Sequence, residues 1–190
     1  MARTKRTPEE TKDHILQAAA RLIRRSGPSV SLAAIAAEAN VSKGGLLYHF
    51  PSKNDLLHGL VTDVMQRFRA QVEEADRRAR DFTPGHLSRA YIRTVFAGTR
   101  NPKALHEELA LATHLLSEPG LREVTRRNAA RWRAELHDDG LDARAARLII
   151  AATDGSSSGP LWGAILTPDD LVSLERDLLV LTYSAATATS

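Results

Sequence analysis

The stretch SLAAIAAEANVSKGGLLYHFPSK, residues 31–53, decides the architecture that this sequence predicts. Apolar side chains recur at three- and four-residue spacing from about Ser31 to Ala39, which indicates a short amphipathic helix. Asn40 is a residue type that tolerates a left-handed turn, and Ser42 can cap another short helix over Lys43–His49. The stretch therefore predicts two short helices joined by a tight turn. The face that the first of them buries would consist of Leu32, Ile35 and Ala36.

A longer helix is predicted before this pair. Thr7 can cap its free amides, Pro8 suits the first helical turn, and Glu10 stands three residues after Thr7, as in a capping box. Ser26-Gly27-Pro28 ends the helix. Three helices with a tight turn between the second and third have the geometry of a helix-turn-helix, whose last helix enters the DNA major groove.

The third predicted helix has side chains suited to DNA. Glycines would let the backbone approach a duplex closely, whereas lysine, tyrosine and histidine can donate hydrogen bonds to phosphates or base edges. The alternative is that the glycine pair is only a loop and that the aromatic residues belong to the core. The residues expected to contact DNA are Ser42, Lys43, Gly44, Gly45, Tyr48 and His49, with Lys53 directed to the DNA backbone.

The rest of the chain also predicts helices, so the fold class is all-α. Ser52 and Asp55 can cap a helix that continues to Arg80, about 27 residues and roughly 40 Å long. Thr167-Pro168 repeats the start signal of Thr7-Pro8. The remaining helices are expected over residues 84–99, 102–117, 119–137, 142–166 and 168–183.

Composition and charge narrow the class of protein. The chain has 190 residues, 43% hydrophobic and 26% charged, and no cysteine, which is ordinary for a globular protein and rules out disulfides. No apolar run is long enough for a membrane span, and no apolar stretch follows the charged N-terminus as in a signal peptide, so we expect a cytoplasmic protein. Residues 1–53 carry nine basic and four acidic side chains, a net charge of +5, which leaves −2 for the remainder of a chain whose net charge is +3. This asymmetry favours a polyanionic partner at the N-terminal end, although a solvated basic face would give the same pattern.

The stretches 15–19 and 31–53 together resemble the DNA-binding signature of the TetR (tetracycline-repressor) family. The resemblance implies DNA contacts from the residues named above, with Leu46 and Phe50 in the core. Two positions depart from the family pattern: Leu47 stands where many members have tyrosine, and Ala33 where many have a polar or basic residue. The basic N-terminal arm could compensate for the second departure through Arg3, Lys5 and Arg6.

The resemblance also implies a domain organisation. Residues 1–53 would form the DNA-binding domain, and residues 54–190 would form a helical domain for ligand binding and dimerisation. A homodimer would present two recognition helices about 34–36 Å apart to a palindromic operator on double-stranded DNA. A small-molecule effector would bind among the middle helices and change that spacing, with no cofactor or metal required.

Two features of the second half suggest where a partner copy and an effector could bind. Ala151, Gly155, Gly159 and Gly163 recur every four residues, which would form a smooth ridge for close helix packing at the dimer interface; a simple break in the helix is the alternative. Large side chains that could line a ligand cavity, but could equally be core, are Tyr91, Phe96, His114, Trp132 and Trp162. The scarcity of acidic clusters there favours a lipophilic or aromatic inducer.

Catalysis is not indicated by any motif. His106-Glu107-Glu108 lacks the second histidine of a zinc-protease helix, and Ser156-Ser157-Ser158 lacks both the strand-turn-helix setting and an identifiable His/Asp partner for a nucleophile. The remaining alternatives to a repressor are a helical interaction module without DNA contact and an activator or architectural DNA-binding protein of the same fold.

Overall fold

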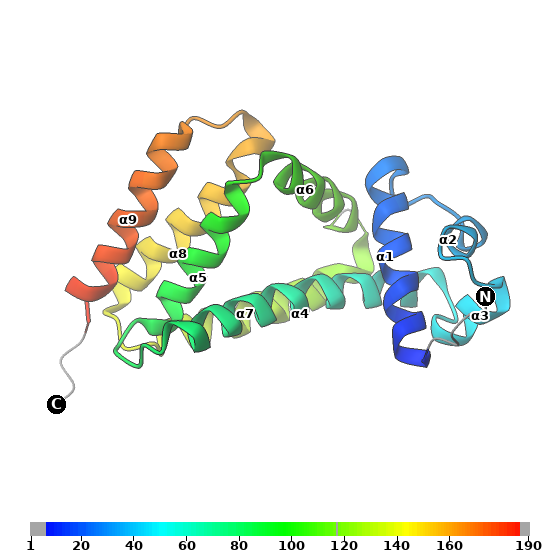
Figure 1. Ribbon diagram of the computed structural model, residues 1–190, viewed down its shortest axis with the longest axis horizontal. Helices are drawn as coiled ribbons and strands as arrows, with labels where there is room; N and C mark the ends of the chain where they lie inside the picture. Colours follow the sequence, from blue (N-terminus) through cyan, green and yellow to red (C-terminus); the bar gives the residue numbers. More distant parts are fainter. Residues whose placement is uncertain (1–6, 117, 187–190) are drawn as a thin grey trace, which may run out of the picture. The chain divides into compact units, whose positions relative to one another are not determined.

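The computed structural model describes residues 7–116 and 118–186, except for the side chains of Pro119, Pro160 and Trp162. Apart from one bridge between Leu141 and Ala186, these residues form helices, turns and connections, which confirms the all-α prediction (Figure 1). The α-helices are α1 (Pro8–Ser26), α2 (Leu32–Glu38), α3 (Lys43–His49), α4 (Lys53–Ala79), α5 (His86–Thr99), α6 (Pro102–Leu116), α7 (Arg122–His137), α8 (Ala143–Ser158) and α9 (Pro168–Ser184).

The described chain divides into two compact units. The first contains the described residues up to Met65 together with Ala110–Arg126, and the second contains Gln66–Leu109 and the described residues from Arg127 onward. Helices α4, α6 and α7 therefore contribute residues to both units. The first unit includes α1, α2 and α3, so it contains the predicted helix-turn-helix.

The core of the first unit combines residues that are far apart in the sequence. Ile15, Ile23, Ile35 and Leu46 from α1, α2 and α3 are fully buried. Leu111, Leu115 and Leu121, from the segment around the end of α6, belong to the same apolar cluster. This segment therefore completes the core that holds the three short helices.

The capping pattern read from the sequence is present at both threonine-proline starts. The Thr7 hydroxyl accepts a hydrogen bond from the Glu10 amide at 3.1 Å, while the Glu10 carboxylate accepts from the Thr7 amide at 2.7 Å. Thr167 and Asp170 make the equivalent pair at the start of α9. Each cap satisfies amides that the first helical turn leaves unpaired, and so fixes where the helix begins.

In the second unit, α5, α8 and α9 lie side by side (Figure 1). One apolar cluster of this unit joins Ile92 and Phe96 of α5 to Ile149 of α8 and Leu178 of α9. A second cluster is aromatic, with Phe68, Tyr91 and Trp132 in edge-to-face or tilted contact at centroid separations of 5.3–5.9 Å.

A fully buried arginine ties the start of α5 to the end of α9. Arg89 donates to the Asp81 carboxylate at 2.9 Å and to the Thr182 hydroxyl at 3.2 Å, and its guanidinium lies 4.4 Å from the centroid of the Tyr183 ring. Further bonds run to the Thr83 hydroxyl and to the carbonyls of Thr83 and Pro84. The guanidinium therefore has several partners for its buried charge.

Three predicted helix limits in the second half are wrong. Helix α5 begins at His86 rather than Pro84, because Gly85 has a φ of 85° and donates its amide to the Asp139 carbonyl. The segment expected as one helix from Pro119 begins with a separate 3₁₀ turn, Pro119–Leu121, before α7. The helix expected to reach Leu166 ends at Ser158 and is followed by a 3₁₀ turn, Gly159–Trp162.

Candidate DNA-binding surface

The turn between α2 and α3 has the conformation that the sequence predicts. Asn40 has a φ of 51°, in the left-handed region. Its amide donates to the Ala37 carbonyl and the Val41 amide to the Ala36 carbonyl, both at 3.0 Å, so the last carbonyls of α2 are satisfied. Val41 is half-buried against the core of the unit. The angle between the two short helices is therefore fixed by backbone bonds and by one apolar contact.

Helix α3 is held by one face and leaves the other exposed. The Ser42 hydroxyl accepts from the Gly45 amide at 2.9 Å and caps the helix. Leu46 is fully buried and Phe50, directly after the helix, is 4% exposed, which confirms their expected place in the core. This anchoring fixes which side chains of α3 point into solvent.

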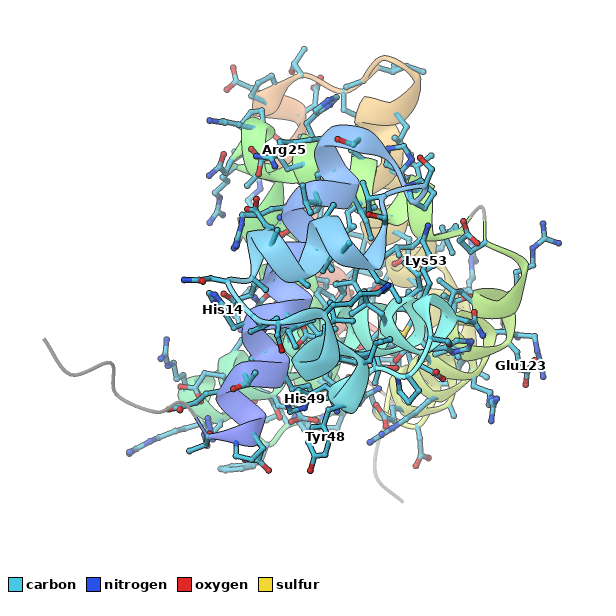
Figure 2. All side chains as sticks on the ribbon, turned by 90° about the vertical axis from the view of Figure 1, so that its right-hand side faces the viewer. His14, Arg25, Tyr48, His49, Lys53 and Glu123 are labelled. Carbon is cyan, nitrogen blue, oxygen red and sulfur yellow. The ribbon has the colours of Figure 1, made fainter. Side chains whose placement is uncertain are left out.

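The described residues expected to contact DNA are all at least partly accessible, in α3, at its cap or at the start of α4. Ser42, Lys43 and Gly44 are exposed, and Gly45, His49 and Lys53 are partly exposed. The Tyr48 side chain is 81% exposed, and its ring meets that of His49 edge to face at 5.2 Å. Figure 2 shows Tyr48 and His49 close together and Lys53 some way from them. The alternative that Tyr48 is a core aromatic is therefore wrong.

The two glycines of α3 have different surroundings. A Cβ added to Gly44 would meet no atom within 4 Å, so this position is an open patch of backbone on the outer surface. A Cβ added to Gly45 would lie 3.2 Å from the Ser42 hydroxyl oxygen, which is the capping atom. Gly45 thus relieves crowding at the cap, whereas Gly44 leaves room for an external surface to approach.

The basic residues of α1 are only partly available to an external anion, because an acidic residue of α2 pairs with two of them. Arg21 and Arg25 of α1 both pair with Glu38 of α2, at 3.1 and 3.6 Å. These pairs tie α1 to α2 and are surface interactions of modest strength. The arm residues named above, Arg3, Lys5 and Arg6, lie outside the described residues.

A glycine that the sequence analysis did not single out sets the packing of α4 in this unit. A Cβ on Gly59 would lie 2.7 Å from a ring carbon of the buried Phe50 and 3.5 Å from Leu16. Gly59 therefore allows α4 to approach the end of α3 closely. The apolar neighbours of Gly59 on α4 made the segment look like an ordinary amphipathic helix, so only the tertiary contact identifies this role.

The second unit contains a cavity of about 840 Å³ beside the ends of α5 and α8 and the start of α9. Of the five residues expected to line a ligand cavity, Phe96 does so. Tyr91 and Trp132 fill the aromatic cluster, where the Tyr91 hydroxyl donates to Asp154 at 2.6 Å, and burial raises the Tyr91 pKa. His114 belongs to the first unit, next to Gly27 at the end of α1. The fifth residue, Trp162, has its side chain outside the described part of the chain.

The small residues expected to form a ridge do not share one helix. Ala151 and Gly155 lie in α8 and Gly159 follows directly in the 3₁₀ turn, but Gly163 has a φ of 85° in the connection to α9. Gly163 therefore does not continue the helical face on which Ala151, Gly155 and Gly159 were expected to lie. Three of the four residues, Gly155, Gly159 and Gly163, line the cavity.

None of the described helices is both long and apolar enough to cross a membrane. Within the same residues, His, Asp and Glu side chains do not gather in a group of three or more that could hold a metal ion.

Two family models match this chain. The model described as bacterial regulatory proteins, tetR family, matches residues 15–60, and the model described as tetracyclin repressor-like, C-terminal domain, matches residues 85–183. The second match alone covers more than half of the chain. The protein belongs to the TetR family: it is a transcriptional regulator with a helix-turn-helix DNA-binding domain.

Individual relatives agree with this assignment. The HTH-type transcriptional regulator AcrR of Shigella flexneri is 47% identical over 58 residues, a match that spans 30% of this chain and 27% of AcrR. A transcriptional regulator from Pseudomonas aeruginosa has a similar fold, with a TM-score of 0.72, 23% identity and coverage of 93% of this chain and 92% of the other. The multidrug binding protein EbrR, in complex with malachite green, is similar at a TM-score of 0.66 and 27% identity, with coverage of 90% and 97%.

Proposed function

We propose that this protein is a ligand-responsive repressor that binds a palindromic operator as a homodimer. Residues 1–53 would act as the DNA-binding domain and residues 54–190 as the domain for ligand binding and dimerisation. Binding to the chromosome would place the protein in the cytoplasm. The observation that carries the proposal is the outward face of α3, where an 81% exposed tyrosine stands on a helix anchored by the buried Leu46.

The proposed contacts follow from the position of each side chain on this face. Lys43 and Tyr48 are exposed and can donate to phosphates or to base acceptors, and His49 can donate beside Tyr48. Gly44 would let the backbone of α3 approach the groove, because nothing covers it. Phosphate contacts from the flanks would come from Ser42, Gly45 and Lys53, and from the arm residues Arg3, Lys5 and Arg6.

The proposal of a homodimer is supported by apolar side chains that α8 and α9 leave exposed. Leu148, Val172, Val180 and Tyr183 are 52–61% exposed, a costly arrangement unless another surface covers them. The small residues Ala151, Gly155, Gly159 and Gly163 would belong to this interface only if the second copy covers the cavity that three of them line. Sedimentation of a Gly159→Leu variant tests this part: an intact dimer would remove these residues from the interface.

Ligand response is supported by one relative and by the cavity of the second unit. EbrR binds malachite green, and its fold extends over nearly the whole of this chain. The cavity, about 840 Å³, has the size of sites that take drug-sized molecules. An effector there would favour one spacing of the two recognition helices over another, and so shift the population away from the DNA-binding state.

The experiment is a gel shift with the operator selected from genomic fragments. We expect Tyr48→Ala and Lys43→Ala each to weaken operator binding by about 10- to 100-fold, because one good contact is worth roughly 1–3 kcal/mol. Lys43→Ala should also lower the salt dependence of binding, since one phosphate contact is lost per protomer. The exposed aromatic Phe82 and the exposed Lys103 provide matched controls as Phe82→Ala and Lys103→Ala.

Each outcome of this experiment has a defined meaning. Thermal stability should stay within about 0.5 kcal/mol for Tyr48→Ala, because the side chain is mostly in solvent. If both α3 variants bind like the wild type, α3 is not the recognition helix. If operator binding raises rather than lowers reporter transcription, the protein is an activator and the repressor proposal is wrong.

A further inference from the structure

The cavity of the second unit is an apolar site with few polar groups. It lies where the end of α5 and the start of α6 meet the end of α8 and the start of α9, together with the connection 163–166 between α8 and α9. Ile165 in that connection is 95% exposed. The apolar side chains that line the cavity include Phe96, Leu105, Leu166, Leu171 and Val172. A ligand in this place would cover apolar surface that now faces water.

Two glycines help to keep this cavity open, because they have no side chain to fill it. A Cβ added to Gly155 or to Gly159 would meet no atom within 4 Å, and both residues line the cavity. Gly159 has helical angles, φ −49° and ψ −43°, which any residue can adopt. The backbone conformation therefore does not require a glycine at position 159. A larger residue there would instead occupy space beside the cavity wall.

Two lining residues are charged, and they are buried to different degrees. Arg100 at the end of α5 donates to Glu175 of α9 at 2.6 Å. The Glu175 side chain is 13% exposed, whereas that of Arg100 is 62% exposed. The carboxylate is thus fixed in the wall of the cavity, while the guanidinium reaches it from the solvent side.

We propose that this cavity binds a bulky apolar cation, whose charge takes the place of Arg100 at the Glu175 carboxylate. The inference rests on the proposed ligand response and names its site and the class of effector. Arg100 can turn into water when it is displaced, because most of its side chain is already solvated. The ligand's apolar groups would meanwhile cover the lining named above.

The same asymmetry disfavours an anionic ligand. An anion would have to pair with Arg100 while the Glu175 carboxylate remained in the wall beside it without its partner. A buried carboxylate that loses its counter-ion is strongly unfavourable. Selectivity for positive charge therefore follows from which partner of the ion pair is buried.

The test measures binding of two ions that match in shape and differ in charge. Tetraphenylphosphonium and tetraphenylborate are titrated into the full-length protein without DNA, and both dissociation constants are measured by calorimetry. We expect the wild type to bind the phosphonium at least about tenfold more tightly than the borate, because the Glu175 carboxylate attracts a cation in this apolar site and repels an anion. The ratio of the two constants isolates the charge, since a change in cavity shape alters both.

Variants of the ion pair give opposite expected results. Glu175→Gln should weaken phosphonium binding by about 10-fold or more and abolish the preference for the cation, because the Coulomb attraction to the carboxylate is lost. Arg100→Gln should instead strengthen phosphonium binding by about threefold or more, because the competing cation is gone. Asp177→Asn, which removes an exposed carboxylate of the same helix, should change neither constant. Gly159→Leu should weaken binding of both ions by filling the cavity, whereas Gly98→Leu, at an open position that does not line it, should not.

Several outcomes would overturn the inference. One is equal binding of the two ions, and another is a preference for the borate. A third is parallel weakening of both ions by Glu175→Gln, which would give this residue only a structural role. If neither ion binds and Gly159→Leu changes the sedimentation of the protein, the cavity is a contact surface between copies. The ion titrations contain no operator DNA. A negative result in them therefore does not contradict the proposed DNA binding, and a negative gel shift does not contradict the proposed binding of cations.

Discussion

Replacing Arg89 with methionine tests the buried arginine of the second unit. The Arg89 side chain is fully buried, pairs with Asp81 and donates to four further oxygen atoms, and methionine keeps much of its apolar stem while removing every one of these bonds. Removing one partner of a buried ion pair costs about 3–5 kcal/mol. The Asp81 side chain is 22% exposed and keeps two bonds from Thr83, so it is not left without partners. We therefore expect a loss near the lower end, about 3 kcal/mol.

Urea denaturation followed by tryptophan fluorescence is a suitable assay for this loss. Both tryptophans, Trp132 and Trp162, belong to the second unit, which also contains Arg89. The midpoint should fall while the slope of free energy against urea stays constant. Arg93→Met is the matched control one turn further along α5, and because Arg93 is exposed we expect a change of less than about 0.5 kcal/mol.

The reasoning is refuted if Arg89→Met lies within about 1 kcal/mol of the wild type, since that is the size of a single neutral hydrogen bond. A variant that does not fold would leave the magnitude unmeasured. Thr182→Val then provides the milder change, because it removes only the acceptor at 3.2 Å from the guanidinium and the bond of that hydroxyl to the Leu179 carbonyl. Its expected cost is about 1 kcal/mol.

Two further predictions concern packing and pH. Gly59→Val should destabilise the first unit by about 1–3 kcal/mol, because the added Cβ would lie 2.7 Å from the Phe50 ring. Hydrogen exchange of the α1 amides measures this loss, and unchanged protection would contradict the packing described for α4. Hydrogen bonds from Thr83, with a smaller contribution from Arg89, lower the pKa of Asp81 from 3.8 to about 2, so the stabilisation from its ionised form is complete above about pH 4 and is lost as the pH falls through about 2. Between about pH 5 and pH 2, urea titrations should show a larger loss of stability for the wild type than for Asp81→Asn, and equal losses would refute the assignment.

The helix-turn-helix could be predicted from sequence because its signals are local. Thr7, Asn40 and Ser42 each act on backbone groups within a few residues, and the bonds they were expected to make or permit are present. Leu46 and Phe50 are buried as expected. Local chemistry of this kind does not depend on how the rest of the chain packs.

The second half was less predictable because its decisive contacts are distant in sequence. The start of α5 depends on a bond from the Gly85 amide to the Asp139 carbonyl, a partner more than fifty residues away. Large aromatic residues such as Tyr91 and Trp132 fill the interior, whereas the cavity exists partly where Gly155 and Gly159 lack side chains. Large residues in a sequence therefore indicate the core more readily than they indicate a cavity.

The contribution of Leu111, Leu115 and Leu121 to the core around α1 has a consequence for building chimeric regulators. An N-terminal fragment that stops at Met65 would lack these leucines and would expose the apolar faces that they cover. Fusing this helix-turn-helix unit to the ligand-binding domain of another protein consequently requires residues 110–126 to be transferred with it, as a second, non-adjacent segment. The part of this protein that can be exchanged is therefore the folded unit, which consists of two separate segments, and not one continuous N-terminal segment.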